Sequence, residues 1–420
     1  MRKLLPILLI LLVLGCVQQP PDGQTAEDIA GDAISEEGVG TLPSDQALEP
    51  PEAPALPESA PEAAIPEALT PPLNLVWMAI VLPSASIGWI NPPTIEDGVV
   101  YVSSDYRRLQ AYSLETGELI WEFATDYKLT TKPTVTENQV YVGSLSGDVY
   151  AVDKGTGTMI WKHDSGAKVH SAPALYESIL ISANAASDVI FGLNADTGQL
   201  VWAFEAGSDV YSSPALGEDR AYIGVNYKGL LALNPLNGNE LWRFSLSQQI
   251  HSPVYHSGSV IFGAGDGFVY SLDASSGAQN WKYDAGFGTM GKYTTTPPGT
   301  VNSTVQINYN LEPRLVRAVA TDGSMVYAPS RDKMLYALDF ETGTLKWQFD
   351  VKNFINSDPI AAGGYVSFGT DDSKIYLLDK ATGTQVWEYD LGGKGISPAS
   401  LGNYLVIPAR DGRLYAFSGE

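Results

Sequence analysis

The chain has 420 residues, with 25 Lys and Arg against 48 Asp and Glu, 44% apolar residues and a single cysteine. This length permits one large domain or two or three ordinary ones. A formal net charge of −23 excludes a typical nucleic-acid binder, which needs a basic surface. One cysteine excludes an intrachain disulfide framework and any multi-cysteine zinc or iron–sulfur site. With 41 Gly, 27 Pro and 22 Tyr, the composition favours a turn-rich β protein.

The N-terminus has the features of a lipoprotein signal. A short basic start precedes an apolar run from Leu4 to Leu14, which is shorter than the roughly 20 residues that span a bilayer. Gly15 and Cys16 follow directly. A small residue before a cysteine at this place resembles the lipobox of prokaryotic lipoproteins, which implies cleavage before Cys16 and a lipid group on its thiol. We therefore expect residues 1–15 to be a signal peptide and Cys16 to be the lipidation site and membrane anchor; the alternative is an ordinary free thiol.

The segment after Cys16 differs from the rest of the chain. Residues 17–72 hold 12 acidic residues, 11 prolines and no Lys or Arg. Because such a composition cannot bury a core, we expect residues 16–72 to form a lipidated, disordered, acidic tether. When these 12 acids and the two basic residues of the signal are set aside, 36 acids and 23 bases remain. The remaining body is therefore acidic, with a net charge of −13, and does not suit a surface of anionic lipid.

Regularly spaced tryptophans reveal an internal repeat. They recur at intervals of 40, 41, 40, 39, 66 and 40 residues: Trp121, Trp161, Trp202, Trp242, Trp281, Trp347 and Trp387. Each lies four residues after a Gly in a turn such as Thr156-Gly157, and short apolar runs such as VYVGS (140–144) and VYAVD (149–153) precede it. A period near 40 residues with short strands indicates a propeller or a solenoid. Each repeat holds four strands, and its proline is expected at the start of the first: Pro133, Pro173, Pro214, Pro253, Pro359 and Pro398.

The two ends of the repeat region complete each other. Residues 395–420 supply the start of a last repeat and stop without a tryptophan strand, whereas LNLVWMA (73–79) is an orphan strand that contains Trp77. At about 40 residues a repeat, residues 73–420 hold eight repeats once the excess in the 66-residue interval is set aside. We predict an all-β fold, an eight-bladed β-propeller with four-stranded blades over residues 73–420. Strands from both termini close the ring and remove its open edge; seven blades are the alternative.

The repeats resemble those of the PQQ-type propeller family. Residues 151–161 (AVDKGTGTMIW) and 337–347 (ALDFETGTLKW) match its docking motif Ala-x-Asp-x-x-Thr-Gly-x-x-x-Trp in full, and the others depart at one to three positions, as at Ser113, Asn237 and Leu377. The resemblance implies that each indole packs against the turn of a neighbouring motif. The residues expected to have this structural role are Trp77, Trp121, Trp161, Trp202, Trp242, Trp281, Trp347 and Trp387.

Four residues are candidates for a ligand site at the mouth of the channel. His170, Tyr211, His251 and Asn356 precede the first strands of blades 3, 4, 5 and 7 at equivalent places, and two histidines from non-adjacent blades could converge there. The alternative is a polar rim that holds no ligand. The other histidines, His163 and His256, lie on outer-strand or turn positions, where we expect them to face solvent. No spacing indicates a catalytic triad, and the recurring carboxylates belong to the turns, so we predict no catalytic residue and no metal site.

An insertion of about residues 285–314 follows the Trp281 strand. Because strands in a blade alternate in direction, this insertion belongs to the face where His170 and His251 emerge. Loops on a rigid scaffold often carry function. The insertion is therefore either a decorative hairpin or a lid or partner-docking arm.

The lipobox, the eight blades and the tryptophan repeats together resemble the BamB-like lipoprotein propellers of outer-membrane protein assembly. The resemblance implies a monomeric, membrane-anchored, extracytoplasmic scaffold, on the periplasmic face or the cell surface. Such a scaffold binds other envelope proteins and has no enzymatic activity, no cofactor and no nucleic-acid partner. The PQQ-type family also includes quinoprotein dehydrogenases, which hold pyrroloquinoline quinone (PQQ) and Ca²⁺ on the channel axis. Many of these use a vicinal cysteine pair that this chain lacks, and a PQQ-dependent dehydrogenase or a small-ligand-binding propeller is the alternative function.

Overall fold

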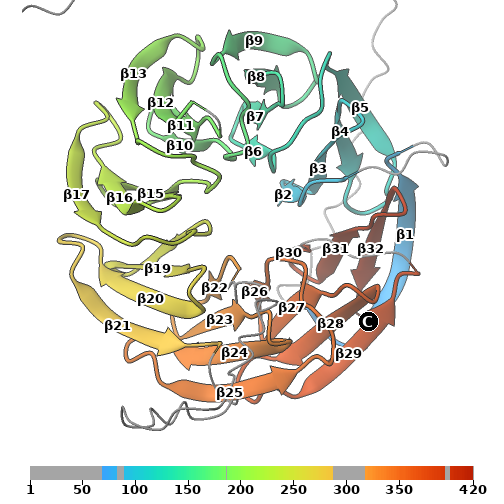
Figure 1. The fold of residues 1–420 in the computed structure, drawn as a ribbon. Helices are drawn as coiled ribbons and strands as arrows, with labels where there is room; N and C mark the ends of the chain where they lie inside the picture. The colour runs from blue at the N-terminus through green and yellow to red at the C-terminus, as the bar shows by residue number, and fades with distance from the viewer. Residues whose placement is uncertain (1–68, 83–88, 186, 287–316, 393–397, 420) are drawn as a thin grey trace, which may run out of the picture. The chain divides into compact units, whose positions relative to one another are not determined.

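The computed structural model describes residues 69–82, 89–185, 187–286, 317–392 and 398–419, all within the compact unit Ala63–Glu420. Thirty-two strands of these residues form eight four-stranded antiparallel sheets, which are the blades of a ring (Figure 1). The predicted eight-bladed propeller is thus confirmed. None of the described residues forms a helix that could cross a bilayer. The predicted signal peptide, Cys16, nearly all of the tether and nearly all of the insertion lie outside the described residues.

The strands occupy four positions in each blade, from the centre of the ring outward. The innermost strands are β2 (Thr94–Glu96), β6 (Thr134–Val135), β10 (Ala174–Tyr176), β14 (Ala215–Leu216), β18 (Val254–His256), β22 (Ala320–Thr321), β26 (Ile360–Ala362) and β30 (Ala399–Leu401). The second strands are β3 (Val99–Ser104), β7 (Gln139–Gly143), β11 (Ile179–Ala183), β15 (Ala221–Val225), β19 (Ser259–Gly263), β23 (Met325–Pro329), β27 (Tyr365–Gly369) and β31 (Tyr404–Pro408). The third strands are β4 (Arg108–Ser113), β8 (Asp148–Asp153), β12 (Val189–Asn194), β16 (Gly229–Leu233), β20 (Phe268–Asp273), β24 (Met334–Asp339), β28 (Lys374–Asp379) and β32 (Arg413–Ser418). The outer strands are β5 (Leu119–Ala124), β9 (Met159–Asp164), β13 (Leu200–Glu205), β17 (Glu240–Phe244), β21 (Gln279–Asp284), β25 (Leu345–Asp350), β29 (Gln385–Asp390) and β1 (Asn74–Ile80).

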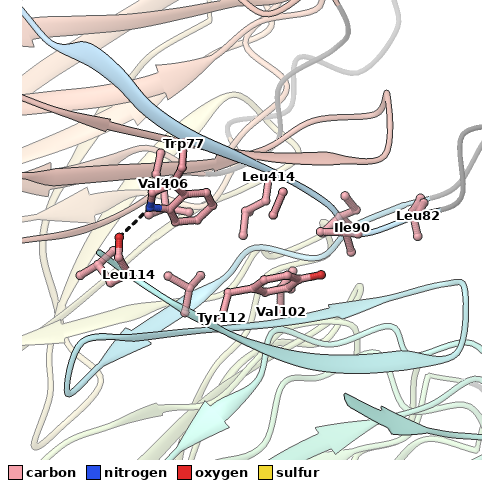
Figure 2. Close-up of a cluster of buried hydrophobic side chains, with 12 residues drawn as sticks. Trp77, Leu82, Ile90, Val102, Tyr112, Leu114, Val406 and Leu414 are labelled. Atoms are coloured by element: carbon pink, nitrogen blue, oxygen red, sulfur yellow. Dashed lines mark hydrogen bonds between the residues drawn. The ribbon is translucent and has the colours of Figure 1, made fainter. Parts of the chain in front are cut away.

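The core lies between the faces of neighbouring blades. In β8 (DVYAVD) every side chain but the last is buried, because both faces of this strand pack against another sheet. In the outer strand β9 (MIWKHD) only Trp161 is fully buried. Between the last blade and the first, Trp77, Val406 and Leu414 pack against Val102 and Tyr112 (Figure 2). The core is therefore a series of apolar layers, one between each pair of blades.

Seven blades have a turn between the third and outer strands, and in each of them a polar side chain at or next to the end of the third strand accepts from the backbone of the turn. Asp153 accepts hydrogen bonds from the Thr156 backbone N–H and hydroxyl, each at 2.8 Å, and Gly157 has a φ of 72°. Left-handed backbone is a conformation that glycine adopts without strain. The predicted prolines also lie where expected, directly before innermost strands such as β6 and β10, at a position that needs no ladder donor.

Each outer-strand tryptophan docks on the following blade. Its indole N–H donates to a backbone carbonyl of that blade at 2.7–3.1 Å; the acceptor lies in the turn between the third and outer strands in seven blades and directly before β1 in blade 8. The donor and acceptor pairs are Trp77 and Leu114, Trp121 and Lys154, Trp161 and Ala195, Trp202 and Pro235, Trp242 and Ala274, Trp281 and Phe340, Trp347 and Lys380, and Trp387 and Leu73. The departure from the motif at Leu377 leaves this contact unchanged in the blade concerned.

The ring closes through the two ends of the chain. Strand β1 pairs antiparallel with β32, from Asn74 opposite Ser418 to Ile80 opposite Arg413, and completes the sheet of blade 8 (Figure 1). Asn403 joins both ends, because its Oδ1 accepts from the Thr70 N–H at 3.0 Å and its Nδ2 donates to the Gly419 carbonyl at 2.8 Å. The orphan strand with Trp77 is thus the outer strand of the last blade.

The space above the turn glycine can be tested with a matched pair of substitutions. Gly98 and Gly157 share a φ of 72°, but a Cβ at Gly98 meets no atom within 4 Å, whereas one at Gly157 would lie 2.7 Å from Cε3 of Trp121. We expect Gly98→Ala to cost about 1 kcal/mol from backbone strain. Gly157→Ala should cost about 2–4 kcal/mol, because it also displaces the indole. Urea unfolding followed by circular dichroism measures both, and equal losses would show that the indole contact is not tight.

Candidate functional site

The ring has two faces with different charge. The loop face comprises the second-to-third turns and the segments that join one blade to the next; the turn face comprises the first-to-second and third-to-fourth turns. Among the described residues, the turns of the turn face carry ten acidic side chains and only three basic ones, Lys154, Arg220 and Lys380. The loop face carries ten acidic side chains and ten basic ones. Its basic residues are Arg107, Lys128, Lys132, Lys168, Lys228, Arg317, Arg331, Lys333, Lys352 and Arg410.

Exposed aromatic side chains gather on the loop face. All the aromatic side chains that are exposed in the described part of the chain lie there, with exposed fractions from 39% to 59%: Trp89, Tyr106, Tyr127, Tyr211, Tyr227 and Phe354. The Arg410 guanidinium lies 3.7 Å from the centroid of the Trp89 ring, and the Lys333 ammonium lies 5.2 Å from that of Phe354. Aromatic residues and arginine are enriched where proteins bind one another. The loop face therefore has the composition of an interaction surface.

The four candidate residues predicted from the sequence lie on this face. Three of them follow a residue that bridges to the second strand: Val169 pairs with Asn184, Ile250 with Ala264 and Ile355 with Thr370. His170 packs against Tyr211 of the next blade, with ring centroids 5.6 Å apart. The charges that act on His251, by contrast, come from arginines of blade 6. The neighbour of His170 is therefore a tyrosine of the next blade, and the charged neighbours of His251 are arginines of blade 6.

His251 has a neighbour that sequence reasoning missed. The backbone N–H of Arg317 donates to the Pro329 carbonyl at 3.2 Å, in the register in which the N–H of His251 donates to Gly263. Arg317 is thus the blade 6 equivalent of His251, and its Nη1 donates to the carbonyl of Asn356 at 3.1 Å. Blade 6 has Val319 where other blades have proline, so the repeat pattern gave no signal at this position.

His251 is a buried base in a cationic surrounding. Its Nε2 is buried and has no hydrogen-bond partner among the described residues. Burial, and then the positive charges of Arg317 and Arg331, lower the pKa of His251 to about 4. The imidazole is therefore neutral at pH 7, with an unused ring nitrogen.

Lys132 and Asp358 hold equivalent positions at the starts of blades 2 and 7, next to the innermost strands. Each stands directly before the proline of its blade, and each side chain is open to solvent. Burial nevertheless lowers the pKa of Lys132 and raises the pKa of Asp358, and each of these shifts is opposed by the charge of the other residue. The charges of these two residues therefore act on each other although blades 2 and 7 are not adjacent in the ring. The shared position before Pro133 and Pro359 is the sequence signal that could have found this pair.

These residues do not fit the PQQ and Ca²⁺ of the alternative function. Calcium takes several oxygen ligands, with carboxylates prominent among them. The Asp358 carboxylate instead interacts with Lys132 and Arg317. No group of three or more His, Cys, Asp or Glu side chains within the described ranges is placed to hold a metal ion.

The two remaining histidines depart from expectation. His163 and His256 are half-buried against aromatic rings instead of facing solvent. The His163 ring lies 6.1 Å from that of Phe191, and His256 meets Phe340 edge-on at 5.4 Å. The prediction was wrong because these positions adjoin the neighbouring blade, which the repeat pattern does not reveal.

Comparison with known proteins supports the fold along the whole propeller. The family described as outer membrane protein assembly factor BamB matches residues 74–202, 186–302 and 294–420. Among solved structures, BamB from Moraxella catarrhalis has a TM-score of 0.66 at 17% identity, covering 83% of this chain and 98% of that one. The computationally designed Ika8 protein has a TM-score of 0.65 at 17% identity, with 80% and 97% covered. Quinohemoprotein alcohol dehydrogenase ADHIIG from Pseudomonas putida HK5 has a TM-score of 0.64 at 15% identity, with 82% and 76% covered. No curated protein matches the chain at a significant level of sequence similarity.

The low pKa of His251 makes a prediction about acid stability. Because the folded pKa of about 4 lies below the ordinary 6.5, the unfolded chain binds a proton between these values that the folded chain does not. His251 therefore lowers the free energy of unfolding as the pH falls from 6.5 to 4, by up to about 3 kcal/mol. Between pH 7 and pH 4 the free energy of unfolding, measured with urea, should therefore fall by about that amount less in the His251→Gln variant than in the wild type. A difference that stays constant with pH would contradict the burial of the imidazole.

Proposed function

The chain belongs to the family of the outer membrane protein assembly factor BamB, and from this membership we propose that it is a membrane-anchored, extracytoplasmic scaffold for envelope protein assembly. It binds other envelope proteins and performs no catalysis of its own. The observation that carries this proposal is the loop face, where every exposed aromatic side chain of the described residues lies beside abundant arginine and lysine.

The chemistry of the loop face suits a protein partner. Large aromatic side chains supply most of the apolar area in protein interfaces at a small cost in side-chain entropy. The aromatic side chains lie on short loops between strands that are fixed in the ring, so binding costs little conformational entropy in these loops. The turn face carries mostly negative charge and lacks this combination. A protein partner therefore has its best contacts on the loop face.

The tether enters on the other face. Thr70 binds Asn403 in the first-to-second turn of blade 8, and the Leu73 carbonyl accepts from Trp387 at 2.9 Å. Both contacts belong to the turn face. The chain thus joins the propeller on its acidic side, away from the exposed aromatic side chains of the loop face.

A second candidate function is the binding of a small anion in the channel. It is favoured by Arg317 and by two buried nitrogens, Arg410 Nε and His251 Nε2, which have no hydrogen-bond partner among the described residues. Isothermal titration with PQQ, with and without Ca²⁺, and a dye-reduction assay with alcohols test this candidate. Turnover in that assay would replace the scaffold proposal.

The loop face is tested by removing two of its most exposed aromatic rings. A tagged chain carrying Tyr127→Ala and Tyr227→Ala should recover about tenfold less membrane protein than the wild type after mild crosslinking in host cells, because interface aromatics carry much of the binding energy. Leu236→Ala, which removes an exposed leucine from the turn face, is the matched control and should recover the wild-type set. Quantitative mass spectrometry measures the recovery. Unchanged recovery in the double variant would contradict the assignment of the loop face.

The anchor is tested separately with Cys16→Ser. Without the thiol there is no site for the lipid, and the chain should move from the membrane fraction to the soluble fraction. Immunoblotting of the two fractions measures this. Retention of the variant in the membrane fraction would refute the lipid anchor and leave the loop-face test unaffected.

A further inference from the structure

The outer strands form a set of eight equivalent edges, one for each blade. Each is the last strand of its sheet and pairs on one side only. An unpaired edge is a template for another strand, and proteins commonly protect such edges with charged side chains. Seven of the eight follow this rule. Their charged residues include Glu122, Lys162, Glu205, Arg243, Lys282, Lys346 and Glu388.

Strand β1 departs from this rule. Its sequence, NLVWMAI, contains no charged residue. The positions one and three residues after the tryptophan, which hold Lys162 and Asp164 in β9, are Met78 and Ile80 in β1. Both side chains are exposed, at 48% and 62%, as are Leu75 and Val76 at 44% and 47%. The strand is thus an apolar edge with no gatekeeping charge.

A β-bulge is another common means of protecting an edge, and β1 has the same bulge as the other outer strands. The register between β1 and β32 shifts between Leu75 and Trp77. The same irregularity precedes the tryptophan in the other blades, as at Trp161 and Trp202. From Trp77 to Ile80 the pairing is regular, so the outer side of this stretch is a straight row of backbone donors and acceptors.

We propose that β1 is a second docking site, which takes a β-strand of a partner protein. Backbone groups along the edge specify a strand as the occupant, and Val76, Met78 and Ile80 specify apolar residues at alternate positions of it. The body of the chain carries a net charge of −13, so charge attraction favours an occupant with basic residues at its ends. A second copy of this chain would bring its own net charge of −13 into the contact, and charge repulsion opposes it.

This proposal rests on the proposed function in one respect, that the chain binds other proteins. Its test uses purified protein and a short synthetic peptide in which valine alternates with threonine between pairs of lysines. The wild type should bind the labelled peptide in fluorescence anisotropy, and hydrogen exchange should show added protection at the amides of β1. Absence of binding, or protection confined to another outer strand, would overturn the docking edge while leaving the loop-face proposal standing.

The decisive variant copies the charges of a protected edge. Met78→Lys combined with Ile80→Asp gives β1 the residues that β9 carries at these positions, and should weaken peptide binding by about tenfold. The control, Ala203→Lys, adds the same charge to the exposed equivalent position of β13 and should bind like the wild type. The single Met78→Lys variant keeps the test usable if the double variant does not fold. Equal affinity in the β1 variants and the wild type would overturn the proposal. So would a wild-type dimer in sedimentation that the β1 variants abolish, because the occupant of the edge would then be a second copy of this chain.

Discussion

The propeller depends on one contact that recurs around the ring: an indole N–H that donates to a backbone carbonyl of the following blade. The contact needs a tryptophan on one outer strand and, in seven of the eight cases, a turn glycine on the next blade whose missing side chain makes room for the ring; Trp387, which docks at Leu73, has no such glycine among the described residues. It ties neighbouring sheets at their outer ends, while their inner faces are joined by apolar packing. The loops of both faces are thereby held in fixed positions relative to one another.

The docking contact also explains why the fold could be predicted from the sequence. In blades 1 to 7 it requires one glycine and one tryptophan four residues apart, so the repeat can be recognised in the sequence. The same requirement identified Trp77 as part of an incomplete repeat and led to the closure with the C-terminal strands. The register of His170 and Asn356 followed from the repeat in the same way.

The composition of the candidate site could be predicted only in part. Lys132, Arg317 and Asp358 belong to blades 2, 6 and 7, and only the closed ring brings their charges together. The repeat pattern also could not predict which aromatic side chains are exposed. Tyr101 is buried and Tyr227 is exposed, although both are tyrosines. Residues that recur in every repeat build the propeller, whereas the residues of the candidate site differ in type from one blade to the next.

The pairing of β1 with β32 has a consequence for the order in which the protein can mature. The first strand of the ring to leave the ribosome finds its partner only when the last residues of the chain have been made and delivered. Until then the edge of β32 has no cover, and Trp387 lacks the carbonyl of Leu73. A chain exported during synthesis must therefore wait outside the cytoplasm as an open arc, and truncation at either end by a protease leaves an arc that cannot close.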